Sequence, residues 1–377
     1  MRIFRVFVVL LALLWGWTAQ AQEQSIVFET TSYRQVFVYV GPSITYPQQV
    51  DILNPGVPVQ VVERNSIGNW VRVQRWADGE LMMDGWILSG YLNSVPELQY
   101  GDLPVTSLPD AAPENVNSPS LATLYQQPVI PTLSAAIREV FERGQAAGNH
   151  ADVITKVGDS LSASVSYITI FSEDGYALGP YGYLEPTLLY YRDSTAGESI
   201  AAQIGMSTYV VFDPFWATDE RCEPNESPLA CEYRVKQPSV AFILFGPNDV
   251  RSMTETEYHE QMRMIIEETL AAGIIPVLMT FSAHPDAELY WQAINFNIEL
   301  VRLTDEYEVP LINLWAAVQP LPEYGLDEDR IHLAPSGFTV LKYDTGHEAF
   351  YGISLQNLLV LRTLDEIRLS LGLDENP

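Results

Sequence analysis

Three short clusters contain side chains suited to nucleophilic chemistry at a carbonyl. The first is Gly158-Asp159-Ser160-Leu161-Ser162, which directly follows the apolar run Val153–Val157. A serine on a strand-to-helix turn projects its hydroxyl beyond the strand, and its own N–H can point at a bound oxyanion. Gly158 relieves crowding on such a turn. Alone, the cluster fits a helix N-cap as well as it fits a nucleophile.

The second cluster is Gly246-Pro247-Asn248-Asp249, which follows the apolar run Val240–Phe245. An asparagine in this place can donate its amide N–H to the negative oxygen of a tetrahedral intermediate. Removing one such donor typically costs about 3 kcal/mol of transition-state stabilisation. Taken alone, the same residues also fit a Pro-Asn turn.

The third cluster is Asp329-Arg330-Ile331-His332. A spacing of three places Asp329 and His332 on the same side of one turn. The carboxylate can hold one ring nitrogen while the other accepts a proton from a serine hydroxyl. Alone, the cluster fits a surface histidine beside acids. Among the five histidines, His284 is the other candidate for the base, because it lies in a loop after a predicted strand.

Buried strands that alternate with helices are expected to position these clusters. Four apolar runs predict strands, and they are Val153–Val157, Val240–Phe245, Ile274–Phe281 and Pro310–Trp315. Three helices are expected: one after Leu133 that ends at Gly144 or Gly148, one from a Thr254/Glu257 capping box to about Gly273, and one over Ser354–Leu371. This order predicts an α/β domain over residues 133–375, a three-layer α/β/α sandwich with a parallel sheet. In such sheets the reactive site lies beyond the carboxyl ends of the strands.

The N-terminal part of the chain has a different pattern. Residues 26–95 contain short β-type runs separated by turn residues, which predicts a small all-β barrel. Residues 96–132 are rich in Pro, Ser, Asn and acids without a sustained period, which predicts an extended linker.

This first part resembles a bacterial SH3-type domain. The resemblance rests on Gly41-Pro42-Ser43 with Tyr46-Pro47, on Gly68-Asn69-Trp70-Val71-Arg72-Val73, and on Gly85-Trp86-Ile87 with Tyr91-Leu92. It implies an SH3-like barrel that can bind cell wall or glycan, with Tyr46, Trp76 or Tyr91 as contacts. Trp70 and Trp86 are expected in the barrel core.

The order and setting of the three clusters resemble the SGNH, or GDSL, hydrolases over residues 140–374. The resemblance implies a flavodoxin-like α/β/α fold and a metal-free, cofactor-free triad of Ser160, His332 and Asp329. It also implies an oxyanion hole built from the Ser160 N–H, a glycine N–H and the Asn248 side chain. Gly205 best fits that glycine, and Gly197 is the alternative.

The N-terminus has the pattern of a secretion signal over residues 1–21. Arg2 and Arg5 precede the apolar run Val6–Trp17, and Ala19-Gln20-Ala21 supplies small residues for cleavage. The run is short for a membrane span, although an uncleaved anchor is the alternative. We therefore expect a secreted, extracytoplasmic protein without a membrane span once the signal is removed. In that compartment, Cys222 and Cys231 are expected to form a disulfide.

The charge narrows the choice of partners. The chain has 48 acidic and 20 basic residues and a formal net charge of −28. Such a surface repels phosphate backbones and anionic lipid heads, so no nucleic-acid partner is expected. The same argument favours a neutral carbohydrate ester or another small ester as substrate. The expected activity is ester hydrolysis through an acyl-enzyme; the alternatives are acyl transfer to a sugar and glycan binding by the first domain.

Overall fold

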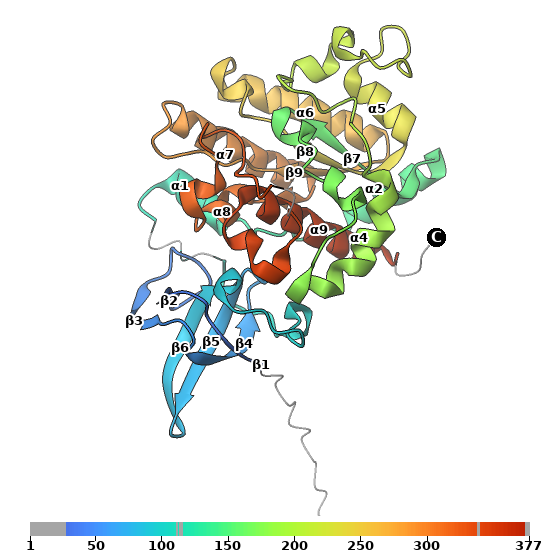
Figure 1. Cartoon of the computed structure of the whole chain (residues 1–377). Coiled ribbons are helices and arrows are strands. Elements are labelled where there is room, and N and C mark those ends of the chain that lie inside the picture. The colour runs from blue at the N-terminus through green and yellow to red at the C-terminus, as the bar shows by residue number, and fades with distance from the viewer. Residues whose placement is uncertain (1–27, 111, 113–115, 338–339, 374–377) are drawn as a thin grey trace, which may run out of the picture.

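The computed structural model describes residues 28–110, 112, 116–337 and 340–373. Two sheets organise this part of the chain, an antiparallel one formed by the N-terminal strands and a parallel one formed by the rest (Figure 1). The segment predicted to be a signal peptide, residues 1–21, lies outside the described residues.

The second sheet is parallel throughout and has the strand order β10-β9-β8-β7. Its strands are β7 (His150–Gly158), β8 (Pro238–Leu244), β9 (Ile275–Met279) and β10 (Leu311–Ile312). Every residue of β8, β9 and β10 is buried, which explains their continuous apolar sequences. β10 is shorter than the predicted run because the Asn313 side chain accepts the Ala316 N–H at 3.2 Å and caps a helix there.

Helices cover both faces of this sheet. Figure 1 shows α5 (Pro228–Lys236) and α6 (Glu255–Ala271) on one side, and α8 (Leu314–Val318) and α9 (Gly352–Leu371) on the other. The remaining helices are α1 (Pro119–Gln126), α2 (Ala136–Ala147), α3 (Ser160–Ala163), α4 (Glu185–Tyr191) and α7 (Tyr290–Tyr307). The predicted parallel sheet with helices on both faces is therefore present. Across the described ranges, no helix combines the length and the apolar character needed to cross a bilayer.

Local signals in the sequence set several helix ends as predicted. The Glu257 carboxylate accepts the Thr254 N–H at 2.8 Å, and the Thr254 hydroxyl accepts the Glu257 N–H at 3.3 Å. This reciprocal pair starts α6. Helix α2 ends at Gly148, whose φ of +102° is available to glycine at little cost.

The first sheet is antiparallel and has the order β1-β4-β5-β6-β2-β3. Its strands are β1 (Phe28–Thr31), β2 (Val36–Tyr39), β3 (Gln48–Leu53), β4 (Pro58–Arg64), β5 (Trp70–Ala77) and β6 (Glu80–Leu88). Trp70 and Trp86 are buried in it. An antiparallel sheet in residues 26–95 agrees with the sequence, whereas closure into an SH3-like barrel stays a prediction.

The segment 96–132 is not the extended linker that its composition predicted. It contains α1, and its side chains Leu98, Tyr100 and Leu124 are buried. The Asn313 side chain donates to the Leu124 carbonyl at 2.7 Å and so ties α1 to the end of β10. The apolar residues of this segment are buried although they have no regular spacing. The prediction of an extended linker, which rested on the missing period, was therefore wrong.

The two sheets are joined by a closely packed junction. A Cβ atom on Gly90 would lie 2.5 Å from the Ala349 Cβ, so the loop after β6 can reach this position only with glycine. Beside it, Glu348 is fully buried and accepts the Tyr181 hydroxyl at 3.4 Å. Burial, which penalises the charged carboxylate, raises the pKa of Glu348 to about 8.

This shift predicts a pH-dependent stability at the junction. An acid whose folded pKa lies above its unfolded value destabilises the fold as the pH rises from about 4.5 to about 8. Glu348→Gln removes that ionisation, so the free energy of unfolding should fall less steeply over this window. The difference is at most about 1.4 kcal/mol per pH unit. Urea unfolding between pH 5 and pH 8 measures it.

The control is Glu97→Gln, the same change at an exposed carboxylate. It should leave the pH dependence of unfolding as in the unmodified chain. If both variants give the same slope as the unmodified protein, Glu348 is not the group that titrates.

Candidate active site

Ser160 lies where β7 gives way to α3. Gly158 ends the strand, and the Asp159 carboxylate accepts the Leu161 N–H at 2.9 Å, which caps the short helix that begins at Ser160. The serine is thus the first residue of a helix at the carboxyl end of a parallel strand. This is the strand-to-helix turn that the sequence predicted.

The structure brings the three predicted triad residues together. The His332 Nε2 atom lies 2.9 Å from the Ser160 Oγ atom, across 172 residues of chain. The His332 Nδ1 atom lies 2.6 Å from an Asp329 carboxylate oxygen. A ring with Nδ1–H directed at the carboxylate presents an unprotonated Nε2 to the hydroxyl, which is the arrangement a general base requires.

Asp329 is held in place by its own loop. Its Oδ1 atom accepts the backbone N–H groups of Ile331 and His332, each at 2.9 Å. Partial burial alone would raise the pKa of Asp329, but the hydrogen bonds from the His332 ring and from these two N–H groups outweigh it, so the pKa is lowered. The carboxylate therefore stays ionised and can stabilise a positively charged imidazole.

The predicted alternative base, His284, does not contact the serine hydroxyl in the described structure. Its Nδ1 atom accepts the Asp286 N–H at 3.2 Å, and its Nε2 atom lies 3.3 Å from a Glu323 carboxylate oxygen. Both ring nitrogens are thus engaged elsewhere. Of the two candidates, only His332 is placed to take the Ser160 proton.

Asn248 lies in the loop after β8, next to a loop from a different part of the chain. Its amide donates to the Met206 carbonyl at 2.9 Å. A side-chain amide has two N–H groups, so the second remains for another acceptor. The next residue, Asp249, accepts the Thr208 N–H at 2.9 Å and the Thr208 hydroxyl at 2.7 Å. These bonds join the loop that follows Gly205 to the loop after β8.

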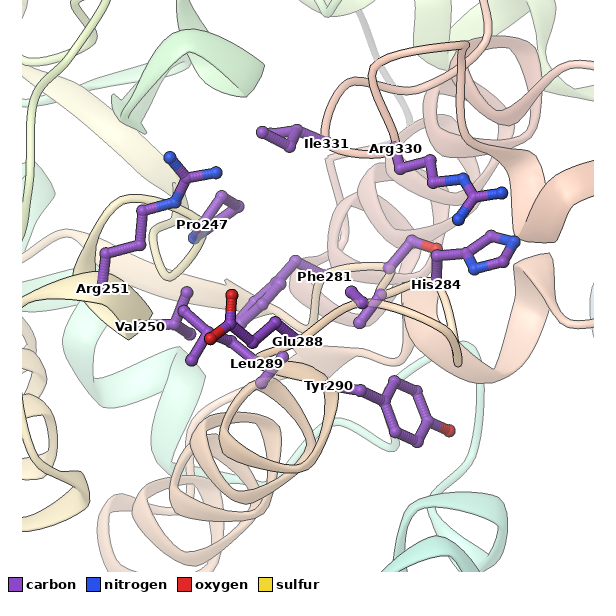
Figure 2. A pocket seen from close by; sticks show the side chains of 14 residues that line it. Pro247, Val250, Arg251, Phe281, His284, Glu288, Leu289, Tyr290, Arg330 and Ile331 are labelled. Carbon is purple, nitrogen blue, oxygen red and sulfur yellow. The ribbon is translucent and has the colours of Figure 1, made fainter.

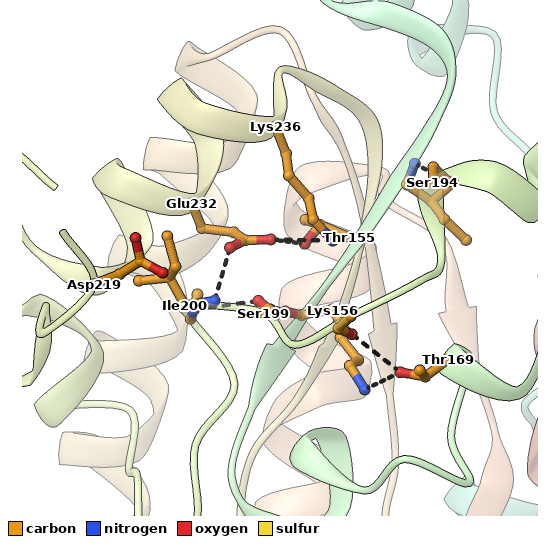
Figure 3. A network of polar contacts seen from close by, with 12 residues as sticks. Thr155, Lys156, Thr169, Ser194, Ser199, Ile200, Asp219, Glu232 and Lys236 are labelled. Atoms are coloured by element: carbon orange, nitrogen blue, oxygen red, sulfur yellow. Dashed lines mark hydrogen bonds and ion pairs between the residues drawn. The ribbon is translucent and has the colours of Figure 1, made fainter. Parts of the chain in front are cut away.

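The segment that leads to Gly205 is anchored to β7 (Figure 3). The Ser199 hydroxyl donates to the Lys156 carbonyl at 2.7 Å, and the Ile200 N–H donates to the Glu232 carboxylate at 2.8 Å. Burial lowers the pKa of Lys156 to about 8, and its ammonium group donates to the Thr169 hydroxyl at 2.8 Å and to nearby carbonyls. The polar groups around this segment thus fix its course along the strand.

This course separates the two candidate oxyanion glycines. Gly158 donates to the Ala201 carbonyl at 2.9 Å, and Gln203 donates to the Gly158 carbonyl at 3.2 Å, so the segment runs parallel to β7. Gly205 comes after this contact, in the part of the segment that runs on past the end of β7 at which Ser160 lies. Gly197 precedes it, toward the other end of the strand. Of the two candidates, Gly205 is therefore the one on the Ser160 side of this contact.

Two buried carboxyl groups, those of Asp159 and Asp249, belong to these loops, and no role was assigned to either from the sequence. Burial raises the pKa of Asp159 to about 7, and the nearby Asp249 charge acts in the same direction. Burial also raises the pKa of Asp249, against the hydrogen bonds from Thr208. Asp159 adjoins Ser160, and Asp249 adjoins Asn248. This position within the two motifs was the only sequence signal that could have indicated a role for either acid.

Two pockets are lined by residues from the loops that carry the candidate site. One of about 430 Å³ is lined by Pro247 and Val250 from the Asn248 loop and by Arg330 and Ile331 from the His332 loop (Figure 2). Another of about 650 Å³ is lined by Ala163, three residues after the serine, by residues 198–200 and by residues 202–204. The first pocket therefore offers space for part of a substrate beside the loops that carry Asn248 and His332.

The predicted disulfide between Cys222 and Cys231 is present. Glu226 lies close to both sulfur atoms, the only such group of potential metal ligands that the described ranges contain. Metals bind the thiolate form of cysteine, and the disulfide consumes both thiols.

The close approach of β7 and β8 at Gly158 gives a stability prediction. A Cβ atom on this glycine would lie 2.1 Å from the Leu244 carbonyl oxygen and 2.3 Å from the Ser162 hydroxyl. Gly158→Ala should therefore lower the free energy of unfolding by about 3 kcal/mol through overpacking. Urea denaturation measures the loss.

The matched control is Gly197→Ala, because Gly197 also has a positive φ, of +83°, but a Cβ atom there would meet nothing within 4 Å. Backbone strain alone should cost about 1 kcal/mol in this variant. Equal losses in the two variants would contradict the steric account of Gly158.

Comparisons with known proteins found similarity only to solved structures, at low identity and low TM-score. No protein family model matches the chain, and no curated protein matches its sequence. Similar solved structures include a GDSL-like lipase from Bacteroides thetaiotaomicron, with 12% identity, 61% of this chain and 98% of that chain covered, and a TM-score of 0.36. The lipase/acylhydrolase from Enterococcus faecalis has 18% identity, 57% and 95% coverage, and a TM-score of 0.36. An acetylxylan esterase from Geobacillus stearothermophilus has 15% identity, with the same coverage and TM-score.

Proposed function

We propose that the chain is an exported serine esterase that hydrolyses carboxylic esters through an acyl-enzyme. The observation that carries the proposal is the His332 ring, whose Nε2 atom lies 2.9 Å from the Ser160 hydroxyl while its Nδ1 atom lies 2.6 Å from the Asp329 carboxylate. A serine hydroxyl becomes a nucleophile when a base in this position removes its proton.

In the first half-reaction, the Ser160 oxygen attacks the ester carbonyl and its proton passes to His332. The negative charge that develops on the carbonyl oxygen is met by the N–H groups of Ser160 and Gly205 and by the amide of Asn248. Asp329 stabilises the imidazolium that forms. His332 then donates its proton to the departing alcohol as the carbon–oxygen bond breaks, which leaves the acyl group on Ser160.

In the second half-reaction, water replaces the alcohol. His332 removes a proton from the water as the water oxygen bonds to the acyl carbon. The bond between that carbon and the Ser160 oxygen then breaks, His332 returns its proton to the Ser160 oxygen, and the acid is released. A sugar hydroxyl in place of water would make the same protein an acyltransferase. Product analysis with and without an added sugar acceptor distinguishes the two, because only transfer yields the acylated sugar.

Export is part of the proposal and rests on the N-terminal sequence and on the disulfide, which suits an oxidising compartment. A glycan-docking role for the first sheet is a separate proposal. Of its three candidate contacts, Trp76 is about half exposed. The Tyr46 hydroxyl donates to the Pro109 carbonyl, and Tyr91 packs against Phe350, so these two are engaged within the chain.

Replacing the nucleophile tests the proposed mechanism directly. Ser160→Ala should lower the kcat/KM for p-nitrophenyl butyrate by about a thousandfold or more, because no acyl-enzyme can form. Initial rates on the purified protein measure the loss, and circular dichroism verifies that the variant is folded. Ser164→Ala makes the same change four residues later and should retain activity. Undiminished hydrolysis by a folded Ser160→Ala protein excludes this nucleophile.

Removing the predicted oxyanion donor should affect kcat more than KM. Asn248→Ala should lower kcat by roughly a hundredfold to a thousandfold, since the donor acts mainly on charge that develops in the transition state. Asn295→Ala removes a half-buried amide that donates to Glu255 on α6, and it should leave both constants unchanged. A rise in KM at constant kcat would instead place Asn248 in ground-state substrate binding.

A further inference from the structure

Two arginines line the pocket between the Asn248 loop and the His332 loop. Arg251 and Arg330 extend from opposite sides of it in Figure 2, and both residues are exposed. Eight other arginines form ion pairs with carboxylates, in a chain whose acids outnumber its bases by 48 to 20. Within the described residues, neither Arg251 nor Arg330 has a side-chain hydrogen bond or an ion pair.

In the part of the chain that the structure describes, no acid around this pocket forms an ion pair with either arginine. Glu288 lines the pocket without an ion pair to either guanidinium among the described contacts. Glu323 lies 3.3 Å from the His284 Nε2 atom. The Nδ1 atom of the same ring accepts the Asp286 N–H at 3.2 Å. The pocket therefore keeps two cationic groups with donors available to a ligand.

The backbone at Arg330 has an unusual conformation for its residue type. Its φ is +57°, in the left-handed region that costs a residue with a side chain about 1 kcal/mol. The Arg330 N–H donates to the Asp327 carbonyl at 2.9 Å and closes the turn. The same turn carries Asp329 and His332, so the arginine is fixed close to the reacting groups.

The rest of the pocket is suited to an organic acid rather than to a bare inorganic ion. Val250, Phe281 and Leu289 supply apolar surface, and the volume of about 430 Å³ admits several carbon atoms. The guanidinium group presents paired N–H donors in a plane, a geometry that matches a carboxylate. Both features can be used at once by a carbon skeleton that ends in a carboxylate.

We propose that this pocket binds a carboxylate carried by the ester substrate, so that the enzyme prefers acidic esters to neutral ones of the same shape. The inference rests on the proposed esterase function and gives it a substrate class. It also replaces the neutral substrate that the overall charge favoured. The carboxylate can belong to the acyl part or to the alcohol part, and the assay has an arm for each.

The assay compares esters that differ only in charge. For the acyl part, the pair is the mono-p-nitrophenyl ester of glutaric acid and the corresponding ester of glutaramic acid. For the alcohol part, the pair is 4-carboxyphenyl butyrate and 4-carbamoylphenyl butyrate. In each pair a neutral amide replaces the carboxylate at nearly constant size. We expect a kcat/KM ratio in favour of the acid of about tenfold or more in one of the two pairs.

The variants assign that ratio to the pocket. Arg251→Gln with Arg330→Gln should reduce the preferred ratio about tenfold, because each lost guanidinium removes a charge-assisted hydrogen bond. Arg75→Gln is the matched control, since Arg75 is exposed on β5, in the other sheet, and should leave both ratios unchanged. Raising the salt concentration should weaken the preference in the unmodified protein.

A binding measurement separates this inference from the proposed function. Titration calorimetry with glutarate and 4-hydroxybenzoate, each against its amide, reports anion binding without turnover. Anion binding that the double variant loses supports the carboxylate pocket. If the protein shows such binding but hydrolyses no ester, only the esterase proposal is refuted. Ser160-dependent hydrolysis with equal rates within both pairs, or a preference that the double variant keeps, overturns the inference and leaves the esterase intact. Absence of both hydrolysis and selective binding overturns both.

Discussion

The candidate site depends on the parallel pairing of β7 with β8. Gly158 is the register partner of Leu244, so the loops that begin at Ser160 and at Gly246 leave the sheet at the same edge. The strands can approach this closely because Gly158 has no side chain, and a Cβ atom there would lie 2.1 Å from the Leu244 carbonyl oxygen. His332 arrives from a third loop and reaches the serine only where these two loops already lie together.

The sequence predicted the fold best where one physical signal dominates a segment. Strands β8 and β9 were predicted from continuous apolar runs, because both strands are buried along their whole length. The Thr254/Glu257 capping box predicted the start of α6. The sequence failed where structure depends on distant partners. Helix α1 is stabilised by Asn313, far along the chain, and its own residues have no clear period. Strand β3 is mostly exposed, so burial left no alternation to detect.

The same distinction applies to the site. Ser160, Asp329 and His332 could be predicted because a triad needs these residue types, because the order of their clusters resembles that of the SGNH hydrolases, and because the chain has few other histidines. The hydrogen bonds between Thr208 and Asp249 could not, because nothing local to either residue indicates the other. The pocket arginines were missed for a similar reason. A free guanidinium is recognised only when every neighbouring carboxylate has been located.

The net charge of the chain therefore says little about what one pocket binds. Charges on a solvated surface are screened over about 8 Å at physiological ionic strength, so most of the acids act on an approaching ligand only weakly. At contact distance, the charged groups that line the pocket determine which ligand binds. Arg251 and Arg330 lie on separate loops. Arg251 closely follows Asn248, and Arg330 closely precedes His332. A substrate carboxylate bound in this pocket would hold the ester next to the loops that carry Asn248 and His332, so binding would also contribute to alignment.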